Sequence, residues 1–237
     1  MAFDWQNRAA ARPGALAEVD AGLRQYMLRV YNYMGAGLAL TGLAAYFAAE
    51  SGIYASLART PLIWVVIFAP LGLVFLLSAR IQTMSLGAAQ ATFWVFAGLM
   101  GLSLSYIFLA YTGVSIVSTF FITGSMFLGT SLYGYTTGRD LTGMGSFMFM
   151  GLIGIIVAMV VNMFLASPVL QFAISVIGVI VFTGLTAYDT QSIKETYVAG
   201  DDGALAGKKA IYGALRLYLD FLNLFLFMLQ FLGQRRD

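Results

Sequence analysis

Long uninterrupted blocks of apolar residues, separated by short polar connections, dominate the chain. The hydrocarbon core of a bilayer is about 30 Å thick, and a helix needs roughly 20 apolar residues to cross it. The chain offers such a block seven times. We therefore expect seven membrane-spanning helices, near residues 30–49, 62–79, 86–110, 114–135, 145–166, 169–188 and 211–232.

The predicted fold class is an all-α membrane protein, because hydrocarbon leaves no partner for backbone groups that do not bond within their own segment. Residues 111–113 and 167–168 form very short connections, so the spans that flank them should be antiparallel hairpins. Residues 1–27 are polar or mixed and form a predicted N-terminal cytoplasmic segment, and residues 28–237 form the transmembrane domain. The N-terminal segment lacks a cleavable signal pattern, so we expect the first span to be retained.

Lysine and arginine are unevenly distributed between the two predicted sides of the membrane. One side carries only Arg59, Arg235 and Arg236, and the other carries Arg8, Arg12, Arg24, Arg29, Arg80, Arg139, Lys194, Lys208 and Lys209. The positive-inside rule predicts a multi-pass protein of the inner membrane with its N-terminus in the cytoplasm and, for seven spans, its C-terminus outside. A re-entrant last span, with both termini cytoplasmic, would satisfy the rule better still and stays open.

The composition excludes several classes of function. The chain has no cysteine and no histidine, which removes disulfides, thiol chemistry, imidazole metal ligands and catalysis by a histidine base. The formal net charge is only +2, which gives no support for a nucleic-acid-binding protein. We therefore expect no enzyme activity and no tightly bound cofactor.

Two carboxylates lie where the apolar pattern predicts hydrocarbon. Asp189 ends the sixth span, and Asp220 lies about nine residues into the seventh, roughly 14 Å along a helix and near mid-depth. A charged group at the bilayer centre costs about 2.5 to 3.5 kcal/mol on insertion scales, so it needs a partner or a polar cavity. Because the sixth and seventh spans are antiparallel neighbours, the two acids approach the same membrane side and can share a site.

Two arginines are candidate counter-ions for this pair. Arg216 stands four residues before Asp220, so the two can form a local ion pair that has no function. Asp189 can equally be an interfacial residue at the end of its span. Arg80, at the inner end of the second span, faces the same side as Asp189, and we predict that it serves as the counter-ion across the bundle.

The chemistry of such a cluster points to a pH-dependent cation site. Two carboxylates held close together do not both ionise easily, so they should titrate as a coupled unit near physiological pH. Protonation of the pair would release Arg80 and remove the negative site that a cation requires. Asp189 and Asp220 suit a hard cation such as Ca²⁺, but this ion takes about six to eight oxygen ligands, so we expect transient passage and not tight storage.

Two segments resemble the Bax-inhibitor (TMBIM) family of membrane proteins, in its bacterial branch. "GLTAYDTQSIK" (residues 184–194) is similar to the family's Tyr-Asp-x-x-x-Ile-Lys segment at the end of the sixth span, and "LYLDFLNLFLFMLQFLG" (residues 217–233) is similar to its last span. The resemblance implies a fold whose seventh helix is central and an activity of pH-sensitive Ca²⁺ leak. It assigns the pH-sensing pair to Asp189 and Asp220 and the latching arginine to Arg80.

Other functions remain in competition with a Ca²⁺ leak. Some bacterial relatives are linked to modulation of a membrane-bound protease, which would make the chain an interaction protein that docks through its N-terminal segment. Acids near mid-membrane also mark proton relays, so a proton-coupled cation exchanger is a further alternative. A retinal protein is excluded because the last span has no lysine, and an intramembrane aspartyl protease is disfavoured because no Gly-x-Gly-Asp motif is present. Beyond membrane lipid, the sequence fixes neither a partner nor an oligomeric state.

Overall fold

The computed structural model describes residues 13–236, with side chains from Ala21 onward. Residues 1–12 of the predicted N-terminal segment lie outside the described part. All regular elements in the described part are helices, apart from an isolated bridge between Tyr111 and Arg235. The helices are α1 (Pro13–Glu50), α2 (Ile53–Ala58), α3 (Leu62–Arg80), α4 (Leu86–Leu104), α5 (Tyr106–Ala110), α6 (Gly113–Thr136), α7 (Thr142–Leu165), α8 (Pro168–Glu195) and α9 (Gly203–Leu232).

Six segments of the described chain are long and apolar enough to cross a membrane. They are α3, α4 together with α5, α6, α7, α8 and α9. Large apolar side chains point outward from them, such as Phe147, Phe164 and Val169, as expected of helices that face lipid. The first predicted span is confirmed as part of a helix, but α1 is not among the six, so its crossing stays a prediction.

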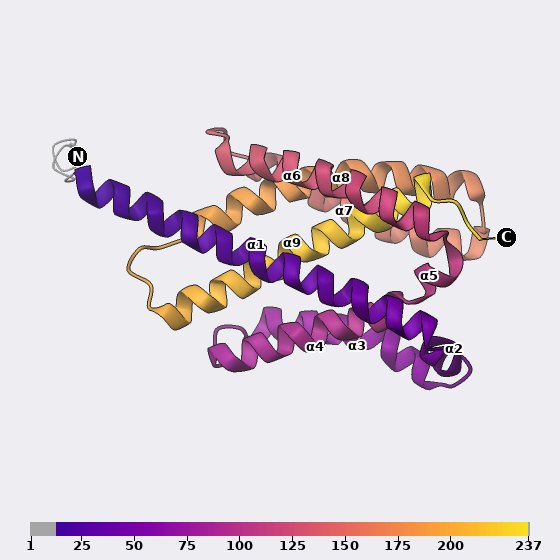
Figure 1. Ribbon diagram of the computed structural model, residues 1–237. Coiled ribbons are helices and arrows are strands. Elements are labelled where there is room, and N and C mark those ends of the chain that lie inside the picture. The colour runs from indigo at the N-terminus through magenta and orange to yellow at the C-terminus, as the bar shows by residue number, and fades with distance from the viewer. Residues whose placement is uncertain (1–12, 237) are drawn as a thin grey trace.

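The N-terminal helix α1 is longer than a bilayer is thick. Its 38 residues correspond to about 57 Å, against a hydrocarbon core of about 30 Å. Figure 1 shows its first turns projecting past the ends of the other long helices. Further along α1, Tyr26 packs on the segment after α8. Its hydroxyl contacts Thr196 Oγ1 at 3.1 Å, and its ring lies 5.7 Å from that of Tyr197.

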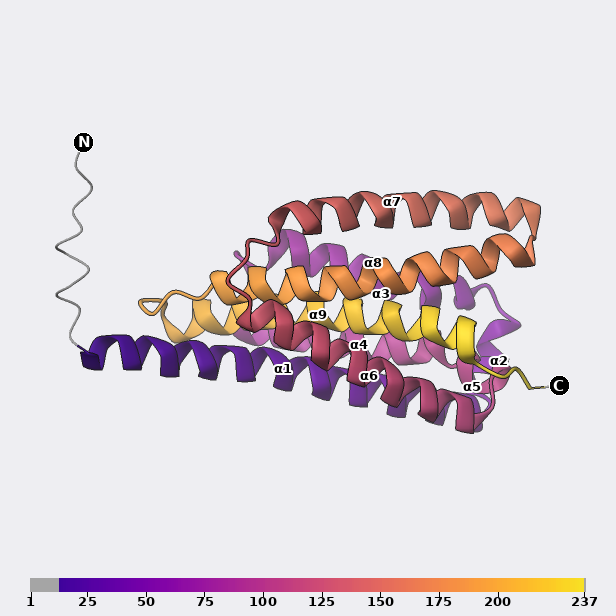
Figure 2. The same cartoon turned by 90° about the horizontal axis from the view of Figure 1, so that it is seen from above.

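The last helix, α9, occupies the centre of the bundle. It packs against α1, α3, α4, α6 and α8, and 61% of its most apolar stretch is buried, compared with 6% for α7. Figure 2 shows α7 on the outside of the molecule, where it lies against α8. The expectation of a central last helix is therefore confirmed, with α7 as the most peripheral of the long helices.

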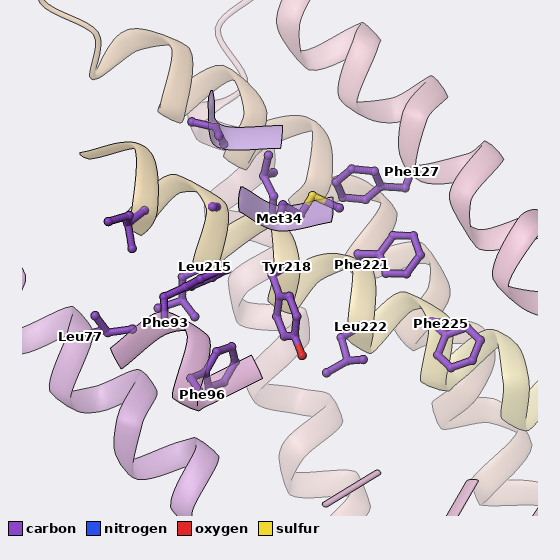
Figure 3. Close-up of a cluster of buried hydrophobic side chains, with 14 of the residues drawn as sticks. Met34, Leu77, Phe93, Phe96, Phe127, Leu215, Tyr218, Phe221, Leu222 and Phe225 are labelled. Atoms are coloured by element: carbon purple, nitrogen blue, oxygen red, sulfur yellow. The ribbon is translucent and has the colours of Figure 1, made fainter. Parts of the chain in front are cut away.

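Tyr218 of α9 organises the largest buried cluster (Figure 3). Its ring packs edge-on against Phe96, with centroids 5.1 Å apart, and against Phe93. Its hydroxyl contacts Thr41 Oγ1 of α1 at 2.7 Å, and Thr41 in turn donates to the carbonyl of Ala97 in α4. A buried phenol needs such a partner, and this chain of bonds joins three helices at one depth.

Side-chain caps start several of the helices. Each cap accepts a hydrogen bond from the backbone N–H three residues later, which satisfies one of the free donors of the first turn. Ser85 does this for α4, Thr112 for α6, Ser167 for α8 and Asp202 for α9. The caps fix where each helix begins and therefore how long its apolar part is.

The last span crosses the bundle completely. From Gly203 to Leu232, α9 runs without a break for 30 residues, about 45 Å. Its C-terminal end lies at the opposite end of the molecule from the start of α1 (Figure 1). A re-entrant last span is therefore wrong, because an unbroken helix of this length has no point at which to turn back.

Candidate functional site

Asp189 and Asp220, the two predicted site residues, come together at the α8–α9 interface. Asp189 is buried because α8 continues for six residues beyond it, about 9 Å, so the acid lies inside the helix and not at its end. Asp220 is buried on the facing side of α9. Both residues line the same cavity.

Arg216 is the counter-ion of this pair in the structure. Its Nε donates to Oδ2 of Asp189 at 3.1 Å and its Nη2 donates to Oδ1, a two-pronged arrangement that fixes both side chains. Its Nη1 donates to the hydroxyl of Ser192 at 3.1 Å. The guanidinium thus ties α9 to one turn of α8.

Asp220 is the less satisfied of the two acids. Its Oδ2 is buried and has no hydrogen-bond partner among the described residues. A buried polar oxygen without a partner is costly and usually signals a proton, a bound ion or a functional role. The neighbours that bear on it are the carboxyl of Asp189 and the charge of Arg216.

The predicted latch, Arg80, is not part of this cluster. It lies exposed in the last turn of α3 and forms no ion pair with a described residue. The alternative, a local ion pair between Arg216 and Asp220, is not what the structure contains, because Arg216 is ion-paired with Asp189 of α8. The reason is geometric: α3 packs mainly on α4, whereas α8 and α9 are in contact along their length.

A cavity of about 930 Å³ opens beside the acids, between α7, α8 and α9. Asp189, Arg216 and Asp220 line one part of it, and apolar side chains of α7 such as Phe149 and Ile155 line the opposite wall. Arg216 also borders a second cavity of about 480 Å³, which lies toward the α8–α9 connection. The ion pair therefore stands between two cavities.

One face of α9 supplies the polar lining. Arg216, Asn223 and Gln230 follow at intervals of seven residues, with Asp220 between the first two, and all four line the larger cavity. Residues seven apart share a helix face, so the stripe is continuous along the cavity. Asn223 and Gln230 were missed as site residues, although their spacing from Arg216 is visible in the sequence.

Hydroxyl and amide groups hold α8 in register beside the acids. The hydroxyl of Tyr31 in α1 contacts Ser131 Oγ of α6 at 2.6 Å, and Ser131 contacts Thr190 Oγ1 at 2.9 Å. The next residue, Gln191, accepts from the backbone N–H of Leu141 and donates to the carbonyl of Arg139. Both residues directly after Asp189 are therefore fixed from outside α8, Thr190 by α6 and Gln191 by the α6–α7 connection.

The ligand set is too small for a permanent metal site. Within the described residues, no three side chains of Asp, Glu, Cys or His gather in one place. A stable Ca²⁺ site usually takes several carboxylate and carbonyl oxygens. Two acids with an arginine can attract a cation but cannot enclose it.

Comparison with known proteins finds the same family that residues 184–194 and 217–233 resemble. A family model described as "Inhibitor of apoptosis-promoting Bax1" matches residues 23–237. The uncharacterized protein RP147 of Rickettsia prowazekii is 52% identical, over 92% of this chain and 93% of its own length. Inner membrane protein YbhL of Escherichia coli is 48% identical, over 95% and 98% respectively. An uncharacterized protein of Caulobacter vibrioides is 46% identical, over 98% of both chains.

Proposed function

The chain belongs to the Bax inhibitor family of membrane proteins, and from this premise we propose that it is a pH-sensitive Ca²⁺ leak channel gated by the Asp189–Asp220 pair. The observation that carries the proposal is a pair of buried carboxyl groups on the wall of a large cavity, one of which, Asp189, is ion-paired with Arg216. Buried ionisable groups at membrane depth are costly and mark ion or proton pathways.

The charge of the cluster changes with its protonation state. With both acids ionised, Asp189, Asp220 and Arg216 together carry one net negative charge, which attracts a cation. One proton on the pair makes the cluster neutral, and two protons leave the positive charge of Arg216 alone. Cation entry should therefore be favoured at higher pH and suppressed as pH falls.

In this mechanism Arg216 holds the channel closed. Its bidentate bond to Asp189 fills the interface between the two cavities that it borders. A cation that competes for the Asp189 oxygens would displace the guanidinium and join the two cavities. Passage then needs no permanent metal site, only transient replacement of one positive group by another.

The proposed location is the inner membrane, as for YbhL, whose printed name places that relative there. The cluster lies toward the end of the bundle where α8 ends and α9 begins. If the N-terminus is cytoplasmic, as the distribution of lysine and arginine predicts, the smaller cavity faces the cytoplasm.

Ca²⁺ flux into liposomes tests the proposal. Purified protein is reconstituted around a Ca²⁺ indicator, and flux is measured between about pH 6 and 8, the range in which coupled carboxylates are expected to titrate. The parent should leak more at higher pH, and Asp189→Asn and Asp220→Asn should each flatten the pH response. Asp140→Asn removes an exposed carboxylate between α6 and α7 and serves as the matched control, with the parent's pH profile expected.

Three results would contradict the proposal in different ways. Flux no greater than in protein-free liposomes at every pH would remove the leak function and favour a role in modulating a partner such as a membrane-bound protease. A leak that keeps its pH dependence in both Asn variants would mean that Asp189 and Asp220 are not the pH sensor. Saturable flux that requires a proton gradient would identify an exchanger.

A further inference from the structure

The larger cavity reaches a second polar group far from the acids. Gln230 lines it at the opposite end from Arg216, fourteen residues further along α9, which is about 21 Å. Gln230 also borders a cavity of about 390 Å³ at the α7–α8 turn. Like Arg216, it therefore stands between two cavities on the same helix face.

Four side chains form a chain of hydrogen bonds at this end of the cavity, where Gln230 is exposed, and we refer to them as the amide cluster: Asn162, Gln171, Ser175 and Gln230. Gln171 Nε2 donates to Oε1 of Gln230 at 2.7 Å, and Ser175 Oγ donates to the same oxygen at 3.2 Å. Asn162 Nδ2 donates to Oε1 of Gln171 at 3.1 Å. The cluster thus links the end of α7 and the start of α8 to the last turns of α9.

Closing the α7–α8 turn accounts for only some of the hydrogen bonds in the amide cluster. Asn162 Oδ1 accepts from the backbone N–H of Ser167, which closes the α7–α8 turn. Gln230 belongs to no turn, and the turn needs no contact with α9. The bonds to Gln230 instead join the two sides of the cavity mouth.

We infer that the amide cluster is the second constriction of the cation path, closed by hydrogen bonds between uncharged groups, where amide and hydroxyl oxygens contact the passing ion. Amide carbonyl and water oxygens are normal ligands of Ca²⁺. Because no member of the cluster titrates near neutral pH, this constriction is insensitive to pH. The inference rests on the proposed leak function and adds an exit to it.

Gln230→Ala is the sharpest test, because it removes both bonds to Oε1 and opens the cavity mouth. Losing two such bonds should favour the open mouth and raise Ca²⁺ flux about tenfold. The pH midpoint should not change, since Asp220 lies ten residues from Gln230, about 15 Å along α9. Leu232→Ala changes an exposed apolar residue at the same end and is the matched control, with parental flux expected.

Gln230→Glu provides a second readout that does not depend on opening. The change keeps the shape of the side chain but adds a carboxylate at the constriction, so the ratio of Ca²⁺ to K⁺ flux should rise. Gln171→Ala, which breaks one of the same bonds from the α8 side, should raise flux less than Gln230→Ala. A monodisperse profile and a cooperative thermal transition verify that each variant is folded.

The outcomes separate this inference from the proposed function. If the parent leaks with the predicted pH dependence but Gln230→Ala and Gln230→Glu match Leu232→Ala in flux and selectivity, the constriction is wrong and the leak function stands. If Gln230→Ala shifts the pH midpoint, or flattens the pH response as the aspartate variants should, the two ends are not independent and the inference also falls. A parent without flux contradicts both.

Discussion

The two ends of the large cavity are closed by different chemistry. At one end Arg216 neutralises Asp189 next to a second acid, and at the other Gln230 is held by neutral donors. Both residues lie on one face of α9, and each borders a further cavity. If the proposed function holds, one helix carries a pH-sensitive closure and a pH-insensitive closure in series.

The charged end is stabilised by attraction between opposite charges, so its strength depends on which groups are ionised. The amide end relies on short dipolar contacts, which contribute less individually but are constant across neutral pH. Changes at the charged end should therefore alter both the amount and the pH dependence of flux. Changes at the amide end should alter the amount alone.

The largest effect is expected from Arg216→Ala. The change removes the group that separates the two cavities and leaves Asp189 without its counter-ion, so Ca²⁺ flux should rise at least about tenfold at neutral pH, the equivalent of about 1.4 kcal/mol. Arg80→Ala is the decisive comparison, because it tests the arginine favoured from the sequence. Parental flux in Arg80→Ala and raised flux in Arg216→Ala would confirm the counter-ion seen in the structure, and the reverse pattern would overturn it.

A packing change should weaken the charged end without touching its charges. A Cβ added to Gly134 of α6 would meet the carbonyl oxygen of Ala187 at 2.1 Å, so Gly134→Ala must push α6 away from α8 near Asp189. Such overpacking typically costs about 1–3 kcal/mol, visible as a lower thermal midpoint in detergent. Gly129→Ala, in open space on the same helix, should keep or slightly raise the midpoint. Equal midpoints for the two variants would refute the contact.

A double variant measures the independence of the two ends. Sites farther apart than about 7–10 Å usually contribute additively, within about 0.3–0.5 kcal/mol. Ca²⁺ flux in the variant carrying both Arg216→Ala and Gln230→Ala should therefore equal the product of the single effects within about twofold. A larger deviation would mean that opening one end already opens the other.

The smallest effect is expected at the outer surface. Arg235 lines the cavity beyond the amide cluster and is exposed, so its charge repels an approaching cation through water. Arg235→Gln should raise Ca²⁺ flux about twofold at low ionic strength and not measurably in high salt, because exposed charges are screened. An equal change at both salt concentrations would show that the side chain acts by blocking the mouth.

Much of the fold could be predicted from the sequence. Apolar blocks of sufficient length give the positions of the six helices that are long and apolar enough to cross a membrane, because hydrocarbon permits only helices that satisfy their own backbone. The ends of the helices were less predictable. The helix α8 continues through the polar stretch after Asp189, where Thr190 bonds to α6 and Gln191 bonds to the α6–α7 connection, contacts that a linear pattern does not reveal.

Asp189 and Asp220 could be recognised from the sequence because a carboxylate in an apolar block is costly and therefore needs a reason. Their meeting at one interface depended on the tertiary structure, and so did the choice of counter-ion. Position along the chain and membrane side suited Arg80, but only the rotation of α8 against α9 decides which arginine reaches the acid. The same rotation turns Asn223 and Gln230 toward the cavity. Composition thus determines what enters the membrane, and helix packing determines which polar groups meet there.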